Sequence, residues 1–244
     1  MALIFSIGVH SSISTRKDAN YFYYKDIQFK YMPLFGEHYA DCLIGRFKSG
    51  HVIDDCYSLM TEFLSAIAFG HDAQIIPEPG MSTRVNCSLV DYTGGFRVSR
   101  RIRVQEFIDQ IWMVPAIRTD HQNFLSRLYR EARSSNNIYH SILFYWHTIV
   151  YPSKSDKKAV IFIDKLWKDP PQHLLYLKDE VERILKNPMF MPSFKEIGSL
   201  GEYFREGIRN SIAHIVRDNR ESLPLQYCRF DSCLSRWWRQ GQSP

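Results

Sequence analysis

The chain has 244 residues, of which 45% are hydrophobic and 14% aromatic, enough apolar material for the core of one large domain or two small ones. No apolar run is long enough to span a bilayer, and the N-terminal residues lack a basic leader with a cleavage site, so we expect a soluble, cytoplasmic protein that does not use a membrane. The net charge of +5 permits a phosphate-rich partner without requiring one, and five scattered cysteines with no CxxC spacing indicate neither a disulfide framework nor a zinc site.

Residues 21–32 show the alternation of a strand. One face of the expected strand carries apolar side chains, and the other carries polar ones. The apolar positions are Tyr21, Tyr23, Ile27, Phe29 and Tyr31. We therefore predict one half-buried strand over this range.

A helix and a hairpin are expected next. Apolar residues recur at helical spacing from Cys56 to Ile67, with Asp54 or Asp55 as the predicted N-cap and Gly70 as the predicted stop. Residues 83–104 contain two β-prone runs around Thr93-Gly94-Gly95, which predicts a β-hairpin.

The second run of this expected hairpin is rich in arginine. Arg97, Arg100, Arg101 and Arg103 could contact the phosphates of a nucleic acid, with neighbouring aromatic side chains available to stack on bases. A solvated strand face explains the same run equally well, and the sequence leaves both readings open.

From about residue 115 the periodicity becomes helical. Residues 124–133 and 138–150 are apolar-periodic, and the Ser-Ser-Asn-Asn segment between them suits a turn and a new N-cap. A charged stretch follows, and then come helical segments over residues 173–185 and 191–218.

These elements predict an α+β fold with three regions. A mixed α/β part with antiparallel strands spans residues 1–114, a helical part spans 115–220, and a tail without clear periodicity spans 221–244. We expect the first part to sense a trigger or to present RNA to the second.

The last predicted helix has a polar row opposite its apolar row. At α-helical spacing, His214 stacks one turn above Asn210, and Arg209 lies beside them. A histidine that titrates near neutrality can transfer protons, and a fixed cation can stabilise a pentacovalent phosphate, so such a set could cleave RNA without a metal. The competing interpretation is a solvated polar face held by i, i+4 contacts.

The segment Arg209-Asn-Ser-Ile-Ala-His214 resembles the R-x4–6-H signature of HEPN domains. The loose signature also matches at Arg46–His51 and Arg133–His140, but only Arg209–His214 lies within one strong helix and has Asn directly after Arg. Its RNxxAH form is similar to that of ApeA-like HEPN proteins. Residues 128–146 resemble the segment upstream of the motif in such proteins and in the MauJ-like set.

The resemblance implies a helical bundle and a metal-independent endoribonuclease that uses the 2′-hydroxyl of its RNA substrate, in phage defence, as a toxin or in a stress response. It implies that Arg209 stabilises the scissile phosphate, that His214 transfers protons and that Asn210 orients one or the other. Arg205 is expected to contact RNA. The resemblance further implies a homodimer without cofactor or metal, with an antitoxin or regulatory protein as a further partner.

Two other functions stay open at this point. One is a catalytically inactive HEPN-like module that binds or scaffolds a protein, nucleotide or nucleic acid. The other is a regulator that binds a sugar or nucleotide, in which Arg209 grips an anion. His140 and His147, seven residues apart on one predicted helix, could be metal ligands, although core or interface histidines are the preferred interpretation.

Overall fold

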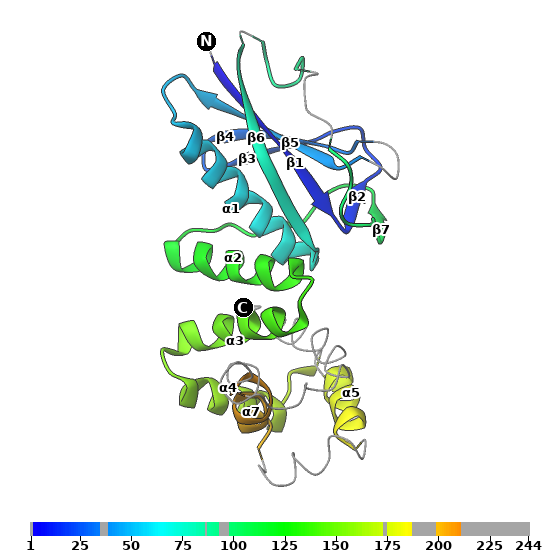
Figure 1. Ribbon diagram of the computed structural model, residues 1–244, viewed down its shortest axis with the longest axis vertical. Helices are drawn as coiled ribbons and strands as arrows, with labels where there is room; N and C mark the ends of the chain where they lie inside the picture. Colours follow the sequence, from blue (N-terminus) through cyan, green and yellow to red (C-terminus); the bar gives the residue numbers. More distant parts are fainter. Residues whose placement is uncertain are drawn as a thin grey trace. The chain divides into compact units, whose positions relative to one another are not determined.

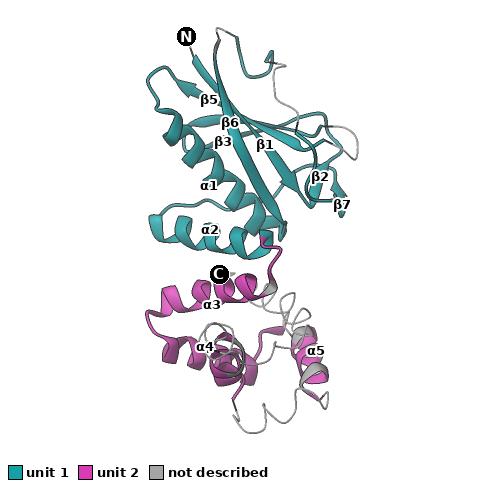
Figure 2. Ribbon diagram, in the orientation of Figure 1, with its two compact units in different colours: residues 1–134 teal, residues 135–244 magenta. Residues whose placement is uncertain are grey.

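A computed structural model of the chain describes residues 2–34, 39–85, 87–92, 98–172, 175–186 and 199–210. The chain divides into two compact units, residues 1–134 and 135–244 (Figure 2). The first unit holds an antiparallel sheet with helices, and the described part of the second is helical (Figure 1). The predicted α+β fold is therefore confirmed.

The first unit contains a five-stranded antiparallel sheet. Its order is β3-β4-β5-β1-β6, so the strand nearest the N-terminus lies between two partners. The strands are β1 (Ala2–Ser11), β3 (Asn20–Tyr24), β4 (Ile27–Met32), β5 (Asp41–Lys48) and β6 (Ile75–Val85). A short parallel pair, β2 (Ile13–Thr15) and β7 (Glu106–Ile108), forms a second sheet. Because β1 is buried on both faces, its sequence lacks the alternation of polar and apolar residues, and this pattern does not predict it as a strand.

The single strand predicted over residues 21–32 is a hairpin. Lys25 and Asp26 have φ angles of 49° and 61°, which places both in the left-handed region that a two-residue turn requires. Tyr24 pairs with Ile27 and Phe22 with Phe29 across this turn. Even positions of β3 therefore share a face with odd positions of β4, so the apolar residues predicted to share one face are divided between two.

Helix α1 (Ile53–His71) packs on one face of the sheet. The predicted helix and its apolar positions from Cys56 to Ile67 agree with this element. Its core contacts include Phe63, whose ring stacks on Phe29 at 4.7 Å between centroids. The N-cap is Val52 rather than an aspartate, and the helix runs past Gly70. A Cβ at Gly70 would lie 2.3 Å from the carbonyl oxygen of Met113, so this glycine permits a close approach of the chain.

The opposite face of the sheet is partly covered by the segment 87–92. Leu89 packs there against Ile4, Cys42 and Ile44. The β-hairpin predicted over residues 83–104 is wrong, because β6 pairs with β1 and residues 98–104 form no strand beyond an isolated bridge of Ser99 to Tyr39. The expected turn at residues 93–95 lies outside the described residues.

Helix α2 (Asp120–Ser134) belongs to the first unit, although the sequence placed it in the helical part. The Tyr129 hydroxyl donates to Asp72, and the Arg133 guanidinium lies 3.1 Å from the same carboxylate. The Ser134 side chain accepts from the backbone N–H of Ile75 and donates to its carbonyl. These contacts join α2 to the connection between α1 and β6, so the first unit ends after residue 134.

The described part of the second unit consists of helices. They are α3 (Ile138–Ser153), α4 (Asp156–Lys168), α5 (Leu175–Leu185), α7 (Leu200–Glu202) and the π-helix η2 (Tyr203–Asn210). Asn137 caps α3 by accepting from the backbone N–H groups of Tyr139 and His140, as predicted for this turn. The predicted tail 221–244 lies outside the described residues, and no helix in the described part is long and apolar enough to cross a membrane.

Candidate functional site

The segment that carries Arg209 is a π-helix rather than the predicted α-helix. Residues Tyr203–Asn210 follow i→i+5 hydrogen bonding, which is rare and is found preferentially at functional sites. The rows of residues four apart that α-helical spacing predicts do not hold here. The Asn210 backbone is described but not its side chain, and His214 lies outside the described residues, so the expected Asn210–His214 stack stays a prediction.

Asp164 of α4 fixes the start of this segment. Its carboxylate accepts from the Ser199 hydroxyl at 2.6 Å and from the backbone N–H of Gly201 at 2.8 Å. A Cβ at Gly201 would lie only 2.5 Å from the carbonyl oxygen of Val160, so the two backbones approach as closely as glycine allows. Two hydrogen bonds and a close backbone contact therefore attach the residues just before the π-helix to α4.

Arg209 lies near a carboxylate at the start of α4. Its Nη1 atom is 4.0 Å from Oδ2 of Asp156, and the other oxygen of that carboxylate accepts from the Trp146 indole N–H at 3.2 Å. The Arg209 side chain retains 29% of its exposure. The guanidinium thus lies within reach of both Asp156 and solvent, at a distance longer than a hydrogen bond from the carboxylate. Asp156 was not predicted as a site residue, although Ser155-Asp156 at the start of a charged stretch is a helix N-terminal signal.

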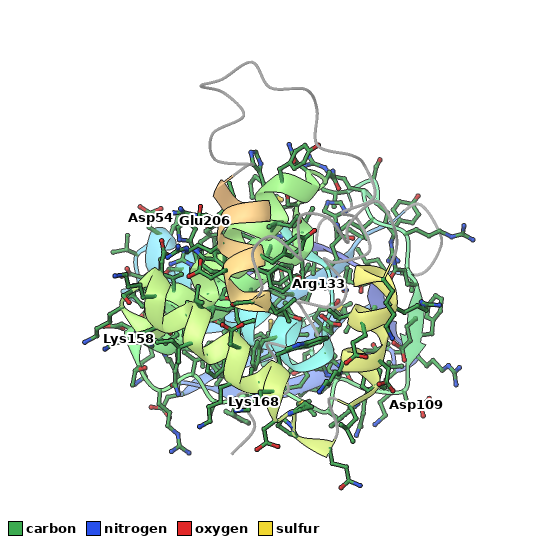
Figure 3. All side chains as sticks on the ribbon, turned by 90° about the horizontal axis from the view of Figure 1, so that it is seen from below. Asp54, Asp109, Arg133, Lys158, Lys168 and Glu206 are labelled. Carbon is green, nitrogen blue, oxygen red and sulfur yellow. The ribbon has the colours of Figure 1, made fainter. Side chains whose placement is uncertain are left out.

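Arg205 lies between two acidic side chains of its own segment. Its guanidinium lies 2.8 Å from Glu202 and 2.7 Å from Glu206, the second of which is labelled on the helix in Figure 3. Two acidic partners within hydrogen-bond distance already compensate this charge. A phosphate would have to compete with both of them, so the predicted contact of Arg205 with RNA gains no support from this geometry.

The arginines of the run from Arg97 to Arg103 differ in burial and in their partners. The Arg100 side chain is only 7% exposed, and it donates to the Asp41 carboxylate at 3.0 Å and to the Tyr39 carbonyl at 2.6 Å. Arg101 is exposed and pairs with Glu78 at 3.1 Å. Arg103 is exposed, and Arg97 lies outside the described residues. The four residues predicted as one nucleic-acid surface are therefore not equivalent, because Arg100 is a buried structural group.

Arg100 is part of a buried polar network that the sequence analysis did not predict. Asp41 accepts hydrogen bonds from the Tyr31 hydroxyl at 2.7 Å and from the Ser14 hydroxyl at 3.1 Å. Burial raises the pKa of Asp41, and these hydroxyls and the Arg100 charge act in the opposite direction. The residues come from β2, β4, β5 and a later loop, so no local sequence signal could have joined them.

His10 of β1 forms a second buried polar contact. Its Nε2 atom lies 2.8 Å from Glu78, and its Nδ1 atom accepts from the backbone N–H of Arg101. Burial lowers the pKa of His10, although Glu78 opposes the shift. Since Nδ1 is an acceptor and Nε2 faces a carboxylate, the neutral imidazole has both nitrogens satisfied inside the fold.

No metal centre is found among the residues that the structure describes. Groups of three or more histidine, cysteine, aspartate or glutamate side chains with suitable geometry do not occur there. His140 and His147 both lie exposed on α3.

Comparison with protein families finds one similarity, to a family that is HEPN-like. The matching family model covers residues 125–228, which include α3, α4, the π-helix and the Arg209–His214 motif. That family is described as methylamine utilization protein MauJ. The match covers less than half of the chain and begins inside α2. Comparisons with curated proteins and with solved structures returned no match.

Proposed function

We propose that the chain is a metal-independent endoribonuclease of HEPN type, cytoplasmic and active as a homodimer. The observation that carries the proposal is the partly exposed Arg209 guanidinium on a π-helix, within a segment that matches a HEPN-like family. Its motif is continued by Asn210 and His214 in the sequence.

In the proposed reaction, the substrate's own 2′-hydroxyl attacks the adjacent phosphorus. The bond from phosphorus to the 5′-oxygen breaks, which leaves a cyclic phosphate on one product and a 5′-hydroxyl on the other. Arg209 stabilises the negative charge of the pentacovalent phosphate, and His214 transfers a proton to or from the reacting oxygens. Asn210 orients either the imidazole or a phosphate oxygen.

Asp156 has a defined part in this proposal. An arginine beside a carboxylate is oriented before substrate arrives, and at 4.0 Å this pair is longer than a hydrogen bond, so a phosphate oxygen at hydrogen-bond distance would be a closer partner than Asp156. The hydrogen bond from Trp146 keeps the carboxylate in place. Asp156 is thus a positioning residue and not a catalytic one.

The same carboxylate also favours a second candidate function. If Asp156 holds Arg209 permanently, phosphate is excluded, and the chain is a catalytically inactive HEPN-like module that binds another molecule. The two functions differ in whether RNA is cut.

The test is an RNA cleavage assay with EDTA and the full-length protein. We expect the wild type to produce cyclic-phosphate ends, and both Arg209→Ala and His214→Ala to reduce cleavage at least about a hundredfold, within the range attributed to general acid–base catalysis and electrostatic stabilisation. His140→Ala is the matched control, because His140 is exposed on α3 and ends another match to the loose signature. Cleavage by His214→Ala at the wild-type rate would refute the assignment, and binding without cleavage by the wild type would favour the inactive module.

A further inference from the structure

The sheet face opposite α1 carries a row of polar and aromatic side chains from three neighbouring strands. Tyr23 of β3 pairs with Gln28 of β4, and Gln28 pairs with Arg46 of β5. Cross-strand partners point to the same face of a sheet, and so do residues two apart along one strand. Tyr21 and Lys48 therefore lie on the same face as this row.

These side chains are open to solvent. Tyr23 is 80% exposed and Tyr21 45% exposed, although both belong to a strand of the central sheet. Arg46 and Lys48 are also exposed. The segment 87–92 covers a neighbouring part of the same face through Leu89 and leaves these four side chains outside its cover.

The charge of this face is positive. None of the residues that β3, β4 and β5 direct to it is acidic; they are Tyr21, Tyr23, Gln28, Lys30, Met32, Cys42, Ile44, Arg46 and Lys48. Among the described residues, neither Arg46 nor Lys48 forms an ion pair, in contrast to Arg100 and Arg205. Acids occur in the neighbouring segments: Asp26 lies in the hairpin turn, and Asp91 of the segment 87–92 accepts a hydrogen bond from Ser88.

Lys30 contributes to this face in a different way. It is buried, donates to the carbonyls of Val90 and Tyr92, and lies 5.7 Å from the centre of the Tyr21 ring. The lysine thus fixes the covering segment and supports the Tyr21 ring from below by a cation–π contact. The Tyr21 ring therefore contacts Lys30, whereas the Tyr23 side chain is largely exposed to solvent.

We propose that this face binds single-stranded nucleic acid, with unpaired bases stacked on Tyr23 and Tyr21 and phosphates contacting Arg46 and Lys48. Exposed aromatic rings beside unpaired cations suit a ligand that offers flat bases and a regular negative charge. Neighbouring strands are about 4.8 Å apart, so Tyr23 and Arg46, two strands from each other, are roughly 10 Å apart at the backbone and can be reached by one short strand. The site goes beyond the proposed function, since it lies in the first unit and involves none of the residues of the Arg209–His214 motif.

The experiment measures binding by the full-length chain carrying His214→Ala, so that cleavage does not consume the probe. The probes are a fluorescently labelled RNA of twelve nucleotides, a DNA of the same sequence and the corresponding RNA duplex. We expect both single strands to bind more tightly than the duplex, because stacking on tyrosine requires unpaired bases. Equal affinity for RNA and DNA assigns the face to single strands in general, and a preference for RNA adds recognition of the 2′-hydroxyl; either result supports the proposal.

The variants separate stacking from charge. Tyr23→Ala should weaken binding of the single strands about tenfold, while Tyr23→Phe should keep most of the affinity, because the ring rather than the hydroxyl stacks. Arg46→Ala and Lys48→Ala should each weaken binding and lower the slope of log affinity against log salt by about one. Arg127→Ala is the matched control, since Arg127 is an exposed arginine on α2 in the same unit.

Three results would overturn the proposal. They are wild-type affinity in Tyr23→Ala, equal affinity of the wild type for single strands and duplex, and binding of polyglutamate as tight as that of RNA. A failure of the nuclease proposal is distinguishable from a failure here, because cleavage depends on Arg209 and His214 whereas this binding depends on Tyr23 and Arg46. Binding that survives in a chain that never cuts RNA would leave the inference intact.

Discussion

Arg100 in the first unit and Arg209 in the second carry the same guanidinium in different surroundings. Arg100 is almost fully buried and donates to Asp41 and to the Tyr39 carbonyl within hydrogen-bond distance. Arg209 is partly exposed and lies 4.0 Å from its carboxylate. The comparison teaches that the distance and burial of the acidic partner, rather than the local density of arginine in the sequence, separate a buried structural cation from a partly exposed one.

The largest expected effect is the loss of stability when Arg100 is removed. Arg100→Ala would leave the Asp41 carboxylate buried without its cation, so we expect a loss of about 3–5 kcal/mol in the free energy of unfolding of the first unit. The ion pair of Arg209 with Asp156 is longer and more exposed, so the loss of this pair in Arg209→Ala should cost less than about 1 kcal/mol. Urea unfolding followed by circular dichroism measures both. Equal unfolding midpoints for the two variants would contradict the distinction.

A smaller effect is expected where α7 meets α4. Gly201→Ala places a methyl group 2.5 Å from the Val160 carbonyl oxygen, and a backbone atom cannot move aside as a flexible side chain can. We expect a loss of about 1–3 kcal/mol in the stability of the second unit, typical of an overpacked contact. Thermal unfolding measures the loss, and the RNA cleavage assay should show reduced activity in the same variant, since the π-helix begins at this attachment. A variant as stable and as active as the wild type would show that this contact does not position Arg209.

The smallest expected effect is the pH dependence of stability that the buried His10 causes. Burial lowers the pKa of His10 below its usual value of 6.5, so the unfolded chain takes up a proton more readily than the folded one. The contribution of His10 to stability is thus complete above pH 6.5 and is lost as the pH falls from there toward the lowered pKa. His71, whose pKa burial also lowers, acts in the same direction.

The measurement is the unfolding midpoint from pH 8 to pH 5. We expect the wild-type midpoint to fall as the pH decreases below 6.5 and the fall to be shallower in His10→Asn, with Glu78 and the Arg101 backbone as the groups that lose their partner. An identical pH profile in the variant would mean that His10 titrates alike in the folded and unfolded chain.

Local periodicity predicted the elements that bury one face. The helix from Cys56 to Ile67 and the Asn137 cap of α3 were read correctly, because each depends on residues close in sequence. The strand β1 and the helix α4 were missed for opposite reasons. The first is buried on both sides and shows no alternation, while the second has charged residues along much of its length.

The sequence predicted which motif carries the candidate site, but it did not predict the geometry of the site. The motif at Arg209 was found from spacing and resemblance, but an α-helical row cannot reveal a π-helix, and Asp156 comes from a helix more than fifty residues earlier. Arg100 shows the same limit, since its buried partner Asp41 lies on β5, far away in sequence. Long-range pairing decides which charges remain available, and sequence patterns do not report it.

Helix α2 determines where the protein chain can be divided into separate fragments. The family match begins at residue 125, inside α2, yet this helix buries Tyr129 and Ala132 in the first unit and ties its end to Asp72. A fragment that starts where the match starts would expose those side chains to water, and a fragment that stops before α2 would uncover the face of α1. The segment that matches the family model and the first compact unit overlap within α2. Expression trials and domain exchanges should therefore place their junction after residue 134.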